Sequence, residues 1–470
     1  MDRLPSQKEN FVIPMVKTLS KGRAIISPFQ KFLKKMVGGS FPLIIAAFIA
    51  ILWANLSRES YSLFREAPLA FGVGSMEMKK SLAHWIDDAL MALFFFSVGL
   101  EIKREILVGE LASFKKALLP VMGAIGGMVA PALIYILFNH GLPTANGWAI
   151  PMATDIAFSL AVLAVLGDRI PVNVRIFLTA LAIADDLGAV LVIGLFYTKT
   201  ISITYLVAAL LILMVLFIAN LLWVRWTLFY GFMGLLLWFV ILKSGIHATV
   251  AGVLVALFIP ARGRYETQIF LQKVKLYLDR FECGGDEGDE EKNECGYTIL
   301  LNRNHLDMVH NIEQACHEVE TPLQRLEYGL HSWVSFLILP LFALVNAGVV
   351  LKGASLSEAF SHPATLGIIF GLVLGKPVGI LAFTWLSVKI FRTPLNKTIR
   401  WPHIAGVSML AGIGFTMSLF IAGLSFDSPE AMEIAKVGII TGSILSAALG
   451  VGFLVAALGM DAKNTVDTNS

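Results

Sequence analysis

Two adjacent aspartates lie in the middle of an otherwise apolar stretch, LTALAIADDLGAVLVIGLFYT, which covers residues 178–198. Asp185 and Asp186 are near the midpoint of a run without other charges that is bounded by Arg175 and Lys199. A charged side chain at the centre of a membrane helix costs about 2.5 to 3.5 kcal/mol on insertion scales, so such residues usually face a partner or a water-filled cavity. The pair therefore indicates a polar site inside a membrane-embedded helix.

Two further ionisable residues occupy equivalent positions. Asp155 and Lys376 each lie near the midpoint of another long stretch without charges. Four ionisable groups on three apolar segments at matched depth predict a shared polar site. The alternative is a buried ion pair that only holds helices together, but one lysine cannot compensate two consecutive carboxylates.

The chemistry of these residues suits competition between a proton and a metal cation. Neighbouring residues on a helix point about 100° apart, so one aspartate can meet Lys376 while the other lines water. Burial and mutual repulsion favour the protonated acid, whereas a lysine or a bound cation favours the carboxylate. Carboxylate oxygens suit a small hard cation such as Na⁺ or Li⁺, and Thr154 could add a hydroxyl ligand. Such competition is the minimum that cation/proton exchange requires.

The composition of the 470-residue chain, 56% hydrophobic and 15% charged, is far from that of a soluble domain and predicts a membrane protein. Twelve apolar stretches approach the roughly 20 residues that a helix needs to cross a hydrocarbon core. We therefore predict an all-α membrane protein with twelve transmembrane helices. The predicted spans are residues 36–56, 82–102, 118–139, 147–166, 174–198, 202–222, 226–242, 246–260, 330–350, 364–388, 404–424 and 434–458.

These spans define the organisation of the chain. The predicted parts are an N-terminal segment (1–35), helices 1 to 8 (36–261) with an outer hairpin near 57–80, a long loop (262–325), helices 9 to 12 (326–458) and a tail (459–470). The basic N-terminal segment lacks the apolar core and cleavage site of a signal peptide. With twelve spans both termini lie on the same side of the membrane, and most lysines and arginines lie on that side as well. This distribution places both termini in the cytoplasm. Because the basic residues flank spans instead of forming one groove, the net charge of +3 does not indicate nucleic-acid binding.

The long loop contains the acidic run GGDEGDEEKNE, which is typical of a solvated, flexible segment. A reducing cytoplasm argues against disulfides here, and no CxxC or HxxxH spacing supports a metal site. The loop holds the cysteines and a group of histidines, namely Cys283, Cys295, Cys316, His305, His310 and His317.

Predicted helices 4 and 11 are interrupted by IPMATD and AGIGFT, and predicted helices 3 and 10 carry Gly and Pro near mid-span. Paired interruptions of this kind point to inverted repeats with discontinuous helices in transporters. Helices 3 to 5 and 10 to 12 are the candidate repeats. Broken helices leave partial charges inside the membrane, which Asp155 and Lys376 could offset.

Six motifs occur in order along the chain: ATDIAF, ALAIADDLGA, LKSGIHATVAGV, LILPLFALVNAGV, GKPVGI and GIGFTMSLFI. Through them the chain resembles the NhaA-type sodium/proton antiporters, a family of inverted-repeat transporters. The similarity extends from about residue 35 to about residue 457, interrupted by the enlarged loop before helix 9. The resemblance implies a fold in which helices 4 and 11 are unwound and cross at mid-membrane.

The resemblance also implies an activity. Asp186 and Asp185 would bind Na⁺ or Li⁺ and protons, Lys376 would pair with Asp185, and Asp155 would balance the crossing helices. The protein would be a secondary active transporter and not an enzyme, without a cofactor, exchanging two protons for one Na⁺ and serving sodium and pH homeostasis. It would act as a homodimer in a bacterial inner membrane, joined through the outer hairpin. A passive cation channel is the alternative.

The family's pH-sensing cluster maps onto the cytoplasmic ends of the predicted helices. Tyr328 takes a position that is often histidine in the family, which removes a group that titrates near neutrality. For the glutamates of EIKRE, the alternative is a solvated flank of the membrane span. The residues implied as pH-sensing are Glu101, Glu105, Glu327 and His331, with His247 associated with them.

Overall fold

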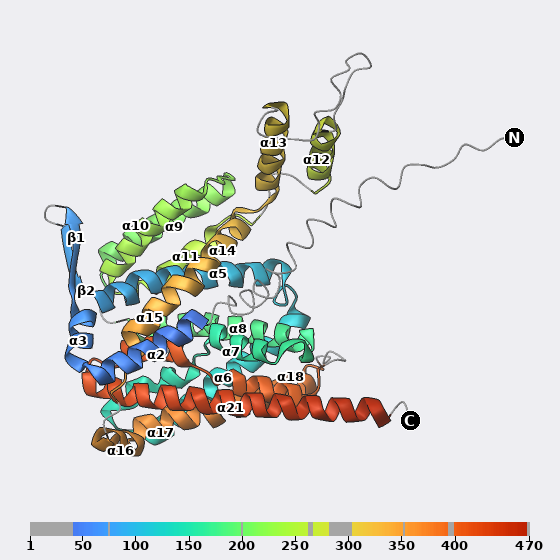
Figure 1. Cartoon of the computed structure of the whole chain (residues 1–470). Helices are drawn as coiled ribbons and strands as arrows, with labels where there is room; N and C mark the ends of the chain where they lie inside the picture. The colour runs from blue at the N-terminus through green and yellow to red at the C-terminus, as the bar shows by residue number, and fades with distance from the viewer. Residues whose placement is uncertain are drawn as a thin grey trace, which may run out of the picture.

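The computed structural model describes residues 41–73, 76–198, 201–261, 267–281, 303–350, 353–392 and 399–467, and most of these residues are helical. The longest helices run side by side as a bundle (Figure 1). Strands β1 and β2 lie at one end, here named the hairpin end, and the last turns of α21 lie at the opposite end (Figure 1).

Seven helices in the described part of the chain are long and apolar enough to cross a membrane. Two bent pairs, each interrupted by a short break, add two further candidate spans. The structure thus confirms a helical, multi-pass membrane protein. The seven are α6 (Phe114–Asn139), α8 (Val172–Phe196), α9 (Ile203–Leu221), α10 (Thr227–Ser244), α14 to α15 (Pro322–Asn346), α17 to α18 (Pro363–Ile390) and the first part of α21 (Pro429–Asp467).

The remaining predicted spans correspond to shorter or more charged helices. Helices α2 (Phe41–Leu56) and α11 (Thr249–Phe258) are apolar but short. Helix α4 (Leu82–Trp85) passes through the π-helical turn η1 (Ile86–Leu90) into α5 (Met91–Val108), and this run carries charges at both ends. All three predicted spans are therefore helical, but α2 and α11 are short and the α4 to α5 run is more charged than the seven long helices.

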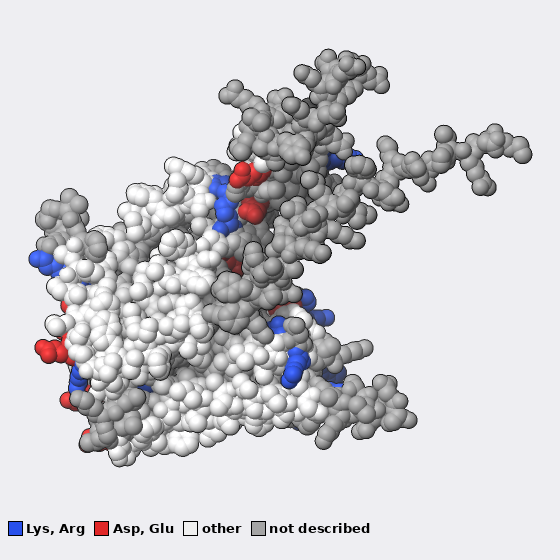
Figure 2. Space-filling view, viewed as in Figure 1, with Lys and Arg blue, Asp and Glu red and all other residues white. Residues whose placement is uncertain are grey.

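The surface of the bundle matches a membrane setting. Large apolar side chains are exposed along α9 and α10, including Leu210, Leu211 and Leu235. On the face drawn in Figure 2, charged residues gather toward the two ends and an uncharged band lies between them. An exposed apolar belt of this kind is stable when lipid, not water, surrounds it.

A small two-stranded sheet forms the hairpin end. Strands β1 (Pro68–Val73) and β2 (Met76–Ser81) pair antiparallel, after the short helix α3 (Arg58–Glu66). The indole N–H of Trp85 donates to the carbonyl of Leu69 at 3.1 Å, and Lys80 Nζ lies 2.5 Å from Asp88 Oδ2. The sheet is thus tied to the start of the α4 to α5 run.

The segment predicted as a long loop contains two helices, α12 (Thr267–Phe281) and α13 (Arg303–Val319). They are linked by an ion pair between Lys273 and Glu318 at 4.0 Å. The acidic run, Cys283 and Cys295 lie outside the described residues, and Cys316 is a free, exposed thiol on α13.

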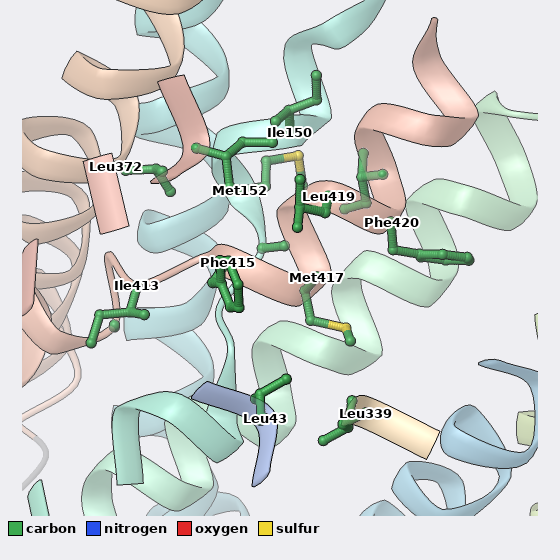
Figure 3. Packing of buried hydrophobic residues seen from close by; sticks show 14 of the residues in the cluster. Leu43, Ile150, Met152, Leu339, Leu372, Ile413, Phe415, Met417, Leu419 and Phe420 are labelled. Atoms are coloured by element: carbon green, nitrogen blue, oxygen red, sulfur yellow. The ribbon is translucent and has the colours of Figure 1, made fainter. Parts of the chain in front are cut away.

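Buried apolar side chains fill the centre of the bundle. Two large clusters occur, one around α6, α8 and α17 to α21 and the other between α5, α9, α10 and α11. Figure 3 shows the first cluster around α20 (Phe415–Ser425), where Phe415, Met417, Leu419 and Phe420 meet Ile150 and Met152 from another segment. The start of α20 is therefore enclosed by apolar side chains.

Helices α6 and α18 (Lys376–Ile390) approach through glycines. A Cβ added at Gly126 would lie 2.2 Å from the carbonyl oxygen of Gly379, and one added at Gly379 would lie 2.0 Å from the carbonyl oxygen of Gly126. Membrane helices use small residues in this way to bring backbones into contact. This contact fixes the position of the helix that begins at Lys376.

Replacing Gly126 with alanine should therefore destabilise the protein, by roughly 1 to 3 kcal/mol in the free energy of unfolding, because the new methyl group meets a backbone oxygen. Gly231→Ala is the matched control, since a Cβ at Gly231 on α10 meets no atom within 4 Å in the described structure. Thermal unfolding in detergent measures both. Equal melting temperatures for the two variants would contradict the proposed close contact.

Candidate functional site

Two interrupted helices lie against each other in the bundle. The 3₁₀ helix η2 (Pro143–Met152) and α7 (Ile156–Val165) bend by 44°, and α19 (Trp401–Leu410) and α20 bend by 48°. The backbone N–H of Asp155 donates to the carbonyl of Ile413 at 2.7 Å. The hydroxyl of Thr154 donates to the carbonyl of Ala411 at 2.9 Å. Each break thus supplies polar partners for the other, as backbone groups inside a membrane require.

Asp155 caps the N-termini of both half-helices. Its Oδ1 accepts from the backbone N–H of Phe158 in α7 at 2.9 Å. Its Oδ2 accepts from the backbone N–H and the hydroxyl of Thr416 in α20, at 3.1 and 2.5 Å. Helix N-termini carry partial positive charge, so one buried carboxylate stabilises two such ends at once. Thr416 was not among the residues singled out in the sequence.

Lys376 forms a fully buried ion pair. It follows the π-helical turn η5 (Gly371–Gly375) at the start of α18, and its side chain is 0% exposed. Its Nζ lies 2.7 Å from Asp185 Oδ2 and also donates to the hydroxyl of Thr154. The structure therefore places Lys376 on a carboxylate and a hydroxyl, next to the two helix breaks.

Asp186 lies on the next position of α8 and is 2% exposed. Among the described residues, Asp186 Oδ2 and Asp185 Oδ1 have no hydrogen-bond partner. A buried acceptor without a partner costs about 1 to 3 kcal/mol, and more when it is charged. Carboxylate oxygens are hard ligands of the kind that small cations prefer.

A cavity of about 170 Å³ lies toward the hairpin end and is here named the hairpin-side cavity. Helix α20 connects it to the site, because Thr416 contacts Asp155 and the following turns of the helix line the cavity. At 1.5 Å per residue, this is a path of roughly 5 to 12 Å. The cavity is lined by His84, Asp87, Asp88, His247, Phe342, Asn346, Leu419, Phe420, Gly423 and Leu424.

Aromatic rings pack where the cavity meets the core. The ring centroid of Phe420 lies 5.6 Å from that of Phe95, 5.4 Å from that of His247 and 6.2 Å from that of Phe342. An aromatic side chain that lines the cavity, that of Phe420, is therefore also packed against the buried Phe95.

A charged cluster lies near the opposite end of α5. Arg104 Nη1 lies 2.5 Å from Glu327 Oε1, and Arg104 Nη2 lies 3.1 Å from Glu105 Oε1 and 3.9 Å from Glu101 Oε1. The structure thus brings together three of the predicted pH-sensing residues around an arginine. Arg104 was not singled out in the sequence, although its i+3 spacing from Glu101 was readable there.

The other predicted pH-sensing residues are placed differently. His331 lies one turn after Glu327 on α14 and contributes to its electrostatic surroundings. His247 lies at the hairpin-side cavity, where its Nδ1 is 2.8 Å from the hydroxyl of Thr249. Tyr328 is 68% exposed, so its side chain points away from the cluster.

The ion pair generates a stability prediction. Lys376→Met should lower the free energy of unfolding by about 3 to 5 kcal/mol, because Asp185 would remain buried without its partner. The double variant Lys376→Met with Asp185→Leu should recover much of the loss. Lys389→Met, the same change at an exposed position of α18, is the control in thermal unfolding. A Lys376→Met protein as stable as the control would rule out the buried pair.

Comparison with known proteins identifies the chain. The family model described as "Na+/H+ antiporter 1" matches residues 30–454. The chain is 45% identical over 439 residues to "Na(+)/H(+) antiporter NhaA 1" of Saccharophagus degradans, covering 93% of each protein. It is 46% identical over 424 residues to "Na(+)/H(+) antiporter NhaA 2" of Syntrophotalea carbinolica, covering 90% of this chain and 95% of the relative. It is 43% identical over 436 residues to "Na(+)/H(+) antiporter NhaA" of Helicobacter pylori strain J99, covering 92% and 96%. With matches of this extent, the chain belongs to the NhaA family of Na⁺/H⁺ antiporters.

Proposed function

We propose that the protein exchanges cytoplasmic Na⁺ or Li⁺ for external H⁺ by alternating access, as a secondary active transporter that needs no cofactor. Family membership supports Na⁺/H⁺ antiport. The observation that carries the mechanism is the pair of buried carboxylate oxygens, on Asp185 and Asp186, that lack a protein partner in the described structure. Carboxylate oxygens without a protein partner can bind a proton at one stage of the cycle and a metal cation at another.

The exchange follows from competition at these oxygens. Na⁺ is held by Asp186, Asp185 and the Thr154 hydroxyl, and its charge stabilises both carboxylates in the ionised form. When Na⁺ leaves, burial and the mutual repulsion of adjacent carboxylates favour proton binding. Na⁺ and protons therefore occupy the site in turn, never together.

The ion pair between Lys376 and Asp185 bears on the number of protons exchanged for each Na⁺. Its bond to Asp185 is available while that carboxylate is charged, and it must rearrange when Asp185 binds a cation or a proton. We propose two protons per Na⁺, so that one net positive charge moves inward in each cycle. The second proton resides on Asp185 or on Lys376, which share one hydrogen bond. The reversal potential of a Lys376 variant that still exchanges ions distinguishes the two.

The proposed membrane topology assigns the two ends. The seven long helices, the two bent pairs, α2, α11 and the α4 to α5 run together supply twelve spans, with the bent pairs crossing at mid-membrane. The basic residues near the termini favour a cytoplasmic location for both ends of the chain in a bacterial inner membrane. The hairpin-side cavity is then the outer entrance, and the cluster around Arg104 lies at the cytoplasmic entrance.

We further propose that this cytoplasmic cluster regulates exchange by pH. Arg104 of α5 lies 2.5 Å from Glu327 of α14, and protonation of Glu327 would release helix α14 from α5. Because position 328 is a tyrosine, His331 is the imidazole on α14 that contributes to the electrostatic surroundings of Glu327. The outer sheet of β1 and β2 is the proposed contact between the two protomers of a homodimer.

A channel would use the same carboxylates differently. Passive Na⁺ flux would be independent of an imposed pH gradient, whereas exchange requires one ion to drive the other. The burial of both carboxylates, which are 1% and 2% exposed, favours exchange over an open pore.

The decisive variant is Asp186→Asn, which keeps the size of the side chain but removes its negative charge. In proteoliposomes with an imposed Na⁺ gradient, Na⁺-dependent proton movement should fall to the level of empty liposomes. Asp307→Asn, the same change on the exposed surface of α13, should leave exchange unchanged. Exchange that persists in Asp186→Asn would refute the assigned site.

A further inference from the structure

Helix α21 contains a second fully buried lysine that the exchange mechanism does not use. The side chain of Lys436 is 1% exposed, and its Nζ lies 3.1 Å from Glu433 Oε1 and 2.9 Å from the carbonyl oxygen of Gly348. Its carboxylate partner is much more accessible, at 36%. An ammonium group is held in the interior only where other interactions offset its desolvation.

The acceptor of Lys436, the carbonyl of Gly348, lies two residues beyond the C-terminus of α15 (Leu339–Asn346). The last carbonyls of a helix lack partners within the helix, and this end carries partial negative charge that a cation stabilises. The hydroxyl of Tyr61 lies 3.0 Å from the carbonyl of Leu344 and 2.7 Å from that of Val345, and it accepts from the N–H of Gly348 at 3.1 Å. Tyr61 thus caps the end of α15, and Lys436 holds the Gly348 carbonyl in the segment that directly follows it.

Asn346, the last residue of α15, bonds an acidic residue of η1 at the hairpin-side cavity. The amide of Asn346 donates to Asp87 Oδ1 at 2.7 Å, and both residues line the cavity. Two positions further, Gly348 cannot be larger, because a Cβ there would lie 2.4 Å from the ring of Tyr61. A continuous set of contacts therefore leads from Lys436 through residues 346–348 to Asp87.

These contacts connect helix α21 to the start of α5. Helix α21 packs against α17, α19 and α20, the last of which begins at the Asp155 cap. Asp87 lies in η1, at the start of α5, on the other side of the cavity. A change in the position of α21 at this end would therefore be transmitted to the carboxylate that faces the outer entrance.

We propose that Lys436 is a positioning residue for the outer entrance: by holding Gly348, just beyond α15, it fixes Asn346, and through Asn346 it fixes Asp87 at the hairpin-side cavity. This proposal rests on the proposed exchange function and on the assignment of that cavity as the outer entrance. The effect should be confined to the outer face of the membrane, because Lys436 acts on one entrance and does not contact Asp185 or Asp186 in the described structure. It sets the half-saturating Na⁺ concentration at the outer face only.

The test compares the two faces in right-side-out and inside-out membrane vesicles. Lys436→Met should raise the half-saturating Na⁺ concentration at the outer face on the order of fivefold, as loss of a buried hydrogen bond implies, and leave the cytoplasmic value unchanged. Lys436→Arg, which keeps a cationic donor, should restore the outer value toward wild type. Lys243→Met, at an exposed lysine in the last turn of α10, is the matched control.

A second variant tests the link that Lys436 acts through. Asn346→Leu keeps the Lys436 bond but removes the bond to Asp87, so it should produce the same sided change even if Lys436→Met fails to fold. The double variant should show no further increase, since coupled residues are not additive. An equal change at both faces, an unchanged outer value in Asn346→Leu, or additive effects would overturn the proposal. Loss of exchange in wild-type vesicles would instead overturn the proposed function.

Discussion

The carboxylate of Asp155 connects the two interrupted helices, and the geometry of the site depends on this connection. Its two oxygens cap the N-termini of α7 and α20, while its own N–H satisfies the carbonyl of Ile413 in the opposite break. Without such partners, the exposed backbone groups of both breaks would be too costly at mid-depth in a bilayer. Because the breaks are stable, the hydroxyl of Thr154 can reach Lys376 at the same depth as the aspartates of α8.

The site separates charges that are compensated from charges that are not. Asp155 is held by helix ends and Asp185 by Lys376, whereas the buried Oδ2 of Asp186 has no hydrogen-bond partner in the described part of the chain. The proposed mechanism assigns a constant structural role to Asp155 and places the exchanged ions at the carboxylate oxygens that lack a partner. At the hairpin end, Tyr61 bonds the last carbonyls of α15, and Lys436 holds the carbonyl of Gly348 just beyond that helix.

The sequence predicted the central residues because the membrane makes mid-span charges costly. Asp155, Asp185, Asp186 and Lys376 were found by depth alone, and the structure brings them together around Thr154. The breaks were found from paired Gly- and Pro-containing interruptions, and they appear as the two bent pairs. These are the positions where one physical constraint outweighs all others.

Residues near the ends of the spans were harder to find, since charges are ordinary there. Arg104, Asp87 and Lys436 were missed for this reason, and no pattern in the sequence shows that Lys436 meets the end of a distant helix. His247 was grouped with the Arg104 cluster, but α10 carries it to the opposite end. The segment 262–325 was read as a loop from its acidic run, yet α12 and α13 flank that run and have amphipathic patterns of their own.

The central claim is that Na⁺ and protons compete for the same buried carboxylates. The most direct test is titration of the purified protein with Na⁺ in calorimetric experiments that use buffers of different ionisation enthalpy. The account predicts that Na⁺ binding releases protons and that the apparent Kd for Na⁺ rises as the pH falls, with both effects absent in Asp186→Asn. Na⁺ binding without proton release, at an affinity independent of pH, would contradict it.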